Sequence, residues 1–177
     1  MIRLFVGLAL PETHRQHLSI ISHGIPGARW VASENLHITL RFIGEVDEDV
    51  AEDLAQALSQ VRATPFEITL KELGTFGEPP HTIWAGVKDE PAGALAALQA
   101  NIESALVRKG LEPEHRKYTP HVTLAHCKKS PVNRVAQYLE GGADLSLAPF
   151  MVTGFTIFQS HLRPEGAEYS RVVEFDF

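Results

Sequence analysis

Two short stretches of the chain each place a histidine two residues before a threonine in an apolar run. They are Leu36-His37-Ile38-Thr39-Leu40 and Pro120-His121-Val122-Thr123-Leu124. Side chains alternate between the faces of an extended strand, so each histidine shares a face with its threonine. Two such pairs facing each other would supply one general acid, one general base and two hydroxyl donors for phosphate oxygens. This set of groups suits the opening of a cyclic phosphodiester without a metal.

The repetition carries more information than either copy alone. In a chain of 177 residues with nine histidines, composition predicts two copies of His-x-Thr-Leu by chance in on the order of one chain in a thousand. A single histidine on such a strand is as well explained by a hydrogen-bonded residue beside a core. For the pair, catalysis is the better interpretation.

Composition indicates one soluble globular domain or two small lobes, with 44% hydrophobic and 21% charged residues. The net charge of −6 argues against a long footprint on duplex nucleic acid. One cysteine, Cys127, permits no internal disulfide, so we expect a reducing, cytoplasmic location. The apolar run from Ile2 to Leu10 is expected to be a buried strand rather than a signal peptide, and no stretch reaches membrane-spanning length.

Strand and helix signals alternate along the chain. Strands are expected at about 2–10, 29–31, 37–43, 66–76, 82–87, 119–126, 150–160 and 169–175, and helices at about 11–23, 47–61, 91–109 and 130–141. This order predicts an α+β fold with two antiparallel sheets, outer helices and a central cleft that carries both motifs. We expect a single domain of two intertwined lobes, about 1–90 and 91–177, with some strands crossing between them.

Basic residues bracket the second motif. His115-Arg116-Lys117 precede it, and Lys128-Lys129 and then Arg134 follow it. A solvated charged rim and a local basic groove explain them equally well.

Several side chains near the motifs have two interpretations. By strict alternation, Arg41 shares the face of the first histidine and threonine, where it could reach a phosphate or lie at a strand end in solvent. Phe42, Trp30 and Tyr118 could stack on a base or pack in the core.

Three other histidines offer a weaker metal hypothesis. His14 and His17 are three residues apart on an expected helix, and His23 follows. No matching cluster of carboxylates or thiolates accompanies them, so an exposed helical face is the better explanation.

The motifs lie in longer segments that resemble a known family. These segments are Arg3–Pro11, Glu34–Val46, Leu73–Phe76, Trp84–Val87, Tyr118–Ala125 and Ser160–Tyr169. Together they span nearly the whole chain and resemble the two-histidine phosphoesterases, and among them the RNA 2′,3′-cyclic phosphodiesterases, first named 2′-5′ RNA ligases. The chain departs from the family at His81 and His126, where arginine is common. A histidine titrates near neutrality, so substrate affinity could differ.

The resemblance implies a bilobal fold with pseudo-twofold symmetry and hydrolysis of a terminal 2′,3′-cyclic phosphate to a 2′-phosphate. It assigns His37 as proton donor and His121 as proton acceptor, an order that the residues alone leave open. Thr39 and Thr123 would bind the phosphate oxygens. Reversible 2′-5′ RNA ligation is expected to be secondary.

The expected partner is RNA with a 2′,3′-cyclic phosphate end, or a cyclic nucleotide. Arg41, Phe42 and His126 are candidate substrate contacts. We expect no cofactor, no metal, no membrane and no obligate protein partner. The alternative is an RNA-binding or nucleotide-binding module on the same fold that binds without turnover.

Overall fold

The computed structural model describes residues 1–177 and contains two antiparallel sheets. The first sheet has the order β3 (His37–Val46), β1 (Ile2–Ala9), β8 (Gly154–Arg163) and β9 (Gly166–Asp176). The second has the order β2 (Arg29–Trp30), β6 (His121–His126), β5 (Thr82–Glu90), β4 (Phe66–Phe76) and β7 (Phe150–Val152). The helices are α1 (Glu12–Ile20), α2 (Glu48–Leu58), α3 (Ala94–Arg108) and α4 (Val132–Gly141), with a 3-10 turn, η1, at Ser33–Asn35.

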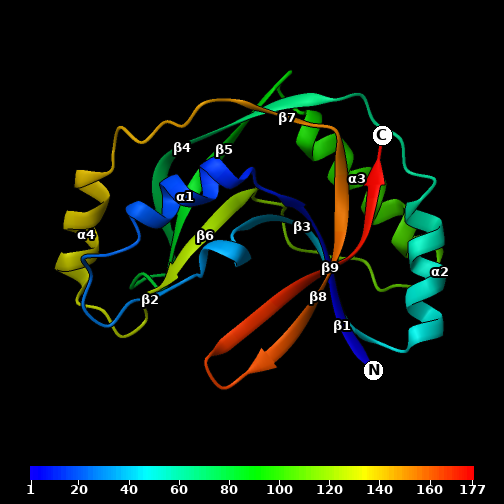
Figure 1. Cartoon of the computed structure of the whole chain (residues 1–177), viewed down its shortest axis with the longest axis horizontal. Coiled ribbons are helices and arrows are strands. Elements are labelled where there is room, and N and C mark those ends of the chain that lie inside the picture. The colour runs from blue at the N-terminus through cyan, green and yellow to red at the C-terminus, as the bar shows by residue number, and fades with distance from the viewer.

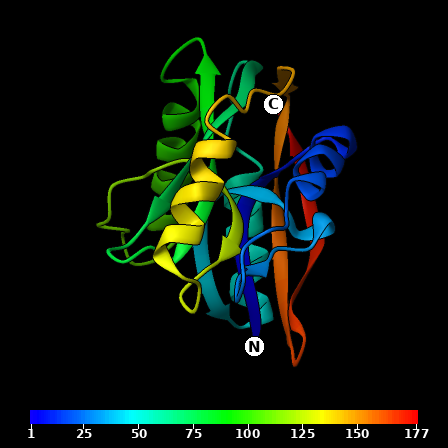
Figure 2. The same ribbon diagram turned by 90° about the vertical axis from the view of Figure 1, so that its left-hand side faces the viewer.

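The helices lie toward the outside of the molecule. In Figure 1, α1 and α4 lie on one side and α2 and α3 lie together on the other. Figure 2 shows the β8–β9 hairpin, orange to red, on one side and the green strands of the second sheet on the opposite side. The predicted α+β class with two antiparallel sheets is confirmed.

One continuous core of 31 buried residues joins the two sheets. Helix α3 shows how the sequence builds it, because Leu95, Leu98, Ile102 and Leu106 recur every three or four residues and are at most 2% exposed. Full burial of each such side chain stabilises the fold by roughly 1.5–3 kcal/mol relative to exposure. None of the helices has the length and apolar character that a membrane span needs.

Each sheet takes strands from both halves of the sequence. Strand β1 lies between β3 and β8, so residues near the two ends of the chain pair directly. Strand β5 lies between β4 and β6. The two motif strands therefore belong to different sheets, and each is held by a central neighbouring strand.

The single strand expected at 150–160 is wrong, because the chain changes sheets within it. Strand β7 pairs with β4 in the second sheet, whereas β8 pairs with β1 and β9 in the first. At the change, a Cβ on Gly154 would lie 2.1 Å from the carbonyl oxygen of Phe175, so a side chain could not fit. Side-chain alternation continues through such a crossing and does not reveal it. Helix α1 also ends at Ile20, earlier than predicted.

Candidate active site

A β-bulge interrupts β3 directly after the first motif. Thr39 lies opposite Gly7 and Arg41 lies opposite Val6, which leaves Leu40 without a partner on β1. An extra residue shifts the alternation of side chains by one. Leu40 and Arg41 are consequently both buried, at 2% and 8% exposure. The expectation that Arg41 shares the face of His37 and Thr39 is therefore wrong.

The second motif strand repeats this bulge. Leu124 has no partner on β5, because Thr123 lies opposite Trp84 and Ala125 lies opposite Ile83. In both strands the next residue returns to the open side. That residue is Phe42 in β3, 58% exposed, and His126 in β6, also exposed. Each strand thus presents a histidine, a threonine and the residue five positions after the histidine.

Both histidines are oriented by the backbone two residues before them. Nδ1 of His37 lies 2.7 Å from the carbonyl oxygen of Asn35, and Nδ1 of His121 lies 2.7 Å from that of Thr119. A carbonyl oxygen only accepts, so each Nδ1 carries a proton and donates it. The neutral ring therefore has its basic atom at Nε2. Nothing in the sequence identified these two carbonyls.

The first histidine lies in an aromatic pocket. Its ring is 4.8 Å from Phe5 and 5.3 Å from Tyr169, which it meets edge to face. Nε2 of His37 lies 2.8 Å from Oγ1 of Thr39. Burial lowers the pKa of His37 below its ordinary value, against the opposing effect of the Asn35 carbonyl, and the nearby His121 lowers it further.

The second histidine is more open. The ring of Phe76 meets that of His121 edge to face at 4.8 Å, and Nε2 of His121 makes no hydrogen bond with the protein. Strands β3 and β6 contact each other, and the Tyr118 hydroxyl donates to the carbonyl of Thr39 at 2.9 Å. The structure thus brings the two motifs together, and the charge of His121 acts on His37.

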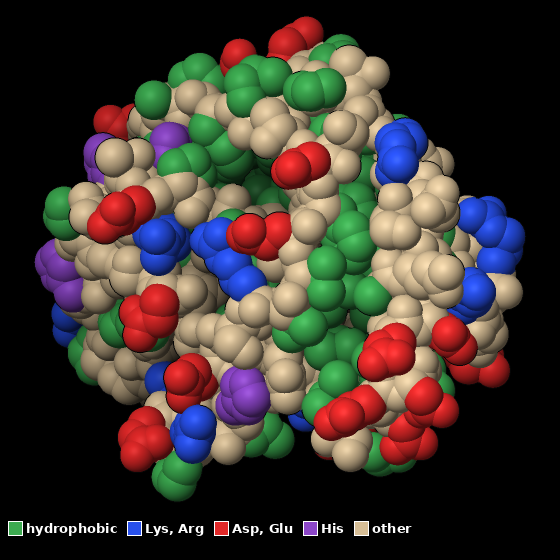
Figure 3. All heavy atoms as spheres, turned by 45° about the vertical axis from the view of Figure 1, so that its right-hand side comes forward, with side chains coloured by type: hydrophobic (Ala, Val, Ile, Leu, Met, Phe, Trp, Pro, Cys, Tyr) green, Lys and Arg blue, Asp and Glu red, His purple; other side chains and the backbone are tan.

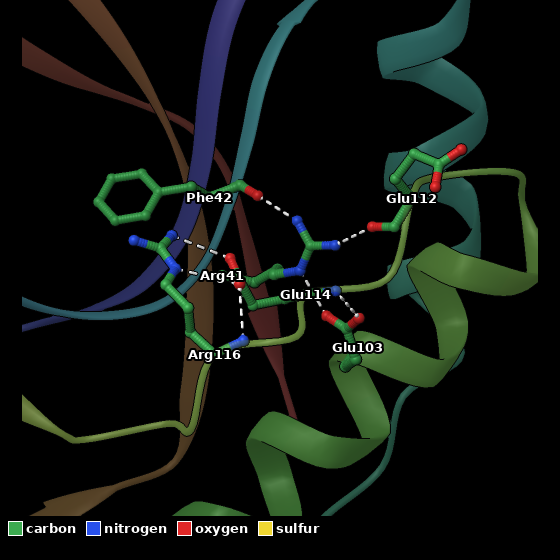
Figure 4. A network of polar contacts seen from close by, with 6 residues as sticks. All are labelled: Arg41, Phe42, Glu103, Glu112, Glu114 and Arg116. Carbon is green, nitrogen blue, oxygen red and sulfur yellow. Dashed lines mark hydrogen bonds and ion pairs between the residues drawn. The ribbon is translucent and has the colours of Figure 1, made fainter.

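Arg41 fastens the segment before the second motif to β3 (Figure 4). Its guanidinium donates to the carboxylate of Glu103 on α3 and to the carbonyls of Phe42 and Glu112. Glu103 also accepts the backbone N–H of Glu114 at 2.9 Å. Partial burial favours a higher pKa for Glu103, but these hydrogen bonds outweigh it and hold the pKa below its usual value. Arg41 thereby acts as a structural clamp.

A cavity of about 270 Å³ opens beside His121. Its lining includes Thr39, Phe42, Phe76, Arg116, Lys117 and Tyr118. Figure 3 shows a hollow in the molecular surface with apolar side chains in its depth and charged side chains around it. The cavity combines an apolar wall with a charged edge of Arg116, Lys117 and the carboxylate of Glu114, next to both candidate catalytic strands.

His126 lies in a separate group of basic side chains. It is opposite Arg29 on β2 and Thr82 on β5. Partial burial lowers its pKa, and the neighbouring charges of Arg29 and His81 add to this effect. The structure therefore brings together the two histidines at which the chain departs from the family.

Two other residues singled out by the sequence have structural partners. Trp30 packs against Tyr138, with ring centroids 5.4 Å apart. His14, expected on an exposed face, is buried, and its Nε2 lies 2.6 Å from the carbonyl oxygen of Ala148. No group of three or more His, Cys, Asp or Glu side chains is placed to hold a metal ion.

Comparisons with known proteins match most of the chain to one family. The family model of the 2′-5′ RNA ligase superfamily matches residues 14–163. The RNA 2′,3′-cyclic phosphodiesterase of Aeropyrum pernix is 36% identical over 159 residues, covering 88% of this chain and 89% of that protein. The enzyme of the same name from Archaeoglobus fulgidus is 32% identical over 181 residues, covering 99% of this chain and 100% of that protein.

Solved structures show the same fold. The crystal structure of E. coli LigT complexed with 3′-AMP matches with a TM-score of 0.78 and 24% identity, covering 99% of this chain and 97% of that one. Sequence and fold agree over nearly the whole chain: this protein belongs to the 2′-5′ RNA ligase superfamily.

Proposed function

We propose that this protein is an RNA 2′,3′-cyclic phosphodiesterase that hydrolyses the cyclic end to a 2′-phosphate by acid and base catalysis from two histidines. The observation that carries the proposal is the matched orientation of His37 and His121. Both Nδ1 atoms are held by backbone carbonyls at 2.7 Å, which leaves both Nε2 atoms for proton transfer. Relatives that cover nearly the whole chain bear this name.

In the proposed reaction, Nε2 of His121 takes a proton from water as the water oxygen attacks phosphorus. The bond from phosphorus to O3′ breaks, and O3′ takes the proton from Nε2 of protonated His37. The products are a 2′-phosphomonoester and a free 3′-hydroxyl. Thr39 and Thr123 donate hydrogen bonds to the non-bridging oxygens, where negative charge accumulates in the transition state.

The assignment of His37 as donor needs a source of its proton, because burial lowers its pKa. A bound phosphodiester raises that pKa, since its negative charge favours the imidazolium, and the ring then takes its proton from solvent. Once the phosphate is bound, Thr39 can turn its hydroxyl from His37 to a phosphate oxygen. We therefore propose that substrate binding favours the protonation of His37 and so prepares it to act as the general acid.

Every proton transfer in this scheme is made by a side chain, so we propose that catalysis is independent of metal. With a 5′-hydroxyl in place of water, the same scheme joins the 2′,3′-cyclic phosphate to it through a 2′-5′ linkage: His121 takes the proton of the 5′-hydroxyl, and O3′ leaves with the proton of His37. We propose this ligation as a secondary activity, because water competes with the hydroxyl at far higher concentration.

The test is incubation of the purified protein, in the presence of EDTA, with a short RNA that ends in a 2′,3′-cyclic phosphate. We expect conversion to the 2′-phosphate, identified by chromatography against 2′- and 3′-phosphate standards. His37→Ala and His121→Ala should each lower turnover by about 10²- to 10⁴-fold. His17→Ala, on the exposed face of α1, is the matched control and should keep wild-type turnover.

Two results would contradict the proposal. A 3′-phosphate product would exclude O3′ as the leaving group. RNA binding without turnover would instead support a non-catalytic module on the same fold.

A further inference from the structure

We propose that Asn35 is a positioning residue for the general acid. Its side chain ties the outer strand β9 to the backbone just before the first motif, and this tie fixes the carbonyl that orients His37. The inference rests on the proposed phosphodiesterase activity and adds a residue that acts on the reaction only through His37.

The side chain of Asn35 makes two hydrogen bonds with the backbone of β9. Its amide nitrogen donates to the carbonyl of Ala167 at 2.7 Å, and its amide oxygen accepts the N–H of Tyr169 at 3.3 Å. Strand β9 is the outer strand of the first sheet, so the backbone groups on its free edge have no partner strand. Asn35 uses both ends of its amide on this edge, which fixes the direction of its side chain.

These two bonds hold a part of the β8–β9 hairpin that β1 does not reach. Strand β1 pairs with β8 only from Thr156 to Gln159, and the rest of the hairpin projects beyond it (Figure 1). The other side-chain hydrogen bonds of the projecting part join its own two strands. Asn35 therefore provides the hydrogen bonds between this part and the rest of the molecule. Beside them, the ring of Tyr169 lies against His37.

The backbone of Asn35 acts on the catalytic ring itself. Its carbonyl oxygen accepts a hydrogen bond from Nδ1 of His37 at 2.7 Å. This bond keeps a proton on Nδ1 of the neutral ring, so Nε2 is the atom that exchanges a proton with O3′. The turn η1 before it is a single short 3-10 turn, which gives the carbonyl little rigidity by itself. Freeing the side chain of Asn35 should therefore also free its carbonyl.

The second motif holds the corresponding carbonyl in a different way. Thr119 is followed by Pro120, whose ring fixes its own φ and confines Thr119 to extended conformations. Leu36, which follows Asn35, imposes no such limit. The chain itself thus restrains the carbonyl that orients His121, whereas the carbonyl that orients His37 depends on a side chain.

The experiment compares two substrates in the variant Asn35→Ala. One is a short RNA that ends in a 2′,3′-cyclic phosphate, whose O3′ needs a proton, and the other is bis(p-nitrophenyl) phosphate, whose leaving group departs without one. We expect kcat on the RNA to fall by about 10- to 100-fold with little change in KM, and activity on the nitrophenyl ester to stay within a few-fold. Asn101→Ala, exposed on α3, is the matched control and should keep wild-type kcat on both.

The ring of His37 gives a second readout. Two-bond proton–nitrogen NMR correlations of the neutral ring should show the Nδ1–H tautomer in the wild-type protein and a larger share of the Nε2–H tautomer in Asn35→Ala. Asn35→Asp keeps an oxygen that can accept from Tyr169, but its carboxylate cannot donate to Ala167. It should show the same selective loss of kcat to a smaller extent, and it decides the comparison if Asn35→Ala does not fold.

Three results would count against these expectations. Wild-type kcat on the RNA in Asn35→Ala, or equal losses on the two substrates in the folded variant, would overturn the inference and leave the phosphodiesterase proposal intact. An unchanged Nδ1–H tautomer in Asn35→Ala would also overturn the inference. Failure of the wild-type protein to hydrolyse the cyclic RNA would instead overturn the proposed function.

Discussion

The two motif strands have the same local construction and different surroundings. Each has a histidine held by a carbonyl two residues earlier, a threonine, and a bulge. Yet His37 lies among aromatic rings and meets Thr39, whereas Nε2 of His121 meets no protein group. A repeated backbone can thus give two identical side chains different chemistry, because burial and neighbours set proton affinity. Water can reach the open histidine, which suits the base, and the enclosed one suits a leaving oxygen.

The largest expected effect tests this division of roles. A substrate whose leaving group departs without a proton, such as bis(p-nitrophenyl) phosphate, needs no general acid. On this substrate His37→Ala should keep activity within a few-fold of wild type, measured by nitrophenolate release. His121→Ala should lose about 10²- to 10⁴-fold on both this substrate and cyclic RNA. The opposite pattern would exchange the donor and acceptor.

A second effect concerns the residue that directly follows the unpaired leucine of each bulge. At this position β3 has Arg41 and β6 has Ala125, and both are buried. Arg41→Ala leaves Glu103 without its cation and should lower the free energy of unfolding by about 3 kcal/mol, measured by urea denaturation. Arg163→Ala, which breaks an exposed pair with Glu168, should cost less than about 1 kcal/mol. Equal losses in the two variants would show that Arg41 is no clamp.

The smallest effect is a shift in titration. Because burial holds the pKa of His37 below 6.5, the imidazolium is lost as pH rises through that lower value. NMR should show a His37 midpoint below 6.5 that rises when inorganic phosphate is added. Tyr169→Ala, which opens the aromatic pocket, should raise the midpoint of the free protein. If neither phosphate nor Tyr169→Ala moved the midpoint of His37, the enclosure of this histidine would not control its proton affinity.

Much of this site could be read from the sequence, and the remainder depends on backbone geometry. Hydrophobic alternation predicted the two motif strands and nearly all the other strands. In the motif strands, for example, Ile38 and Val122 follow the histidines and are buried, as the alternation requires. The bulges could not be foreseen in β3, because Arg41 looks like a surface residue until Glu103 on α3 is in place. In β6 the successive apolar pair before His126 was a usable signal that strict alternation fails.

The pairing of β1 with both β3 and β8 has a consequence for the order in which the chain folds. The enclosure of His37 includes Tyr169 on β9, 132 residues later in the chain. Contacts between residues so distant in sequence form late and slowly, because a long loop must close first. During synthesis, the segment that carries the first motif leaves the ribosome long before β9, whose Tyr169 helps to enclose His37. The part of the difference between the two histidines that comes from Tyr169 is therefore acquired only when β8 and β9 have joined the first sheet.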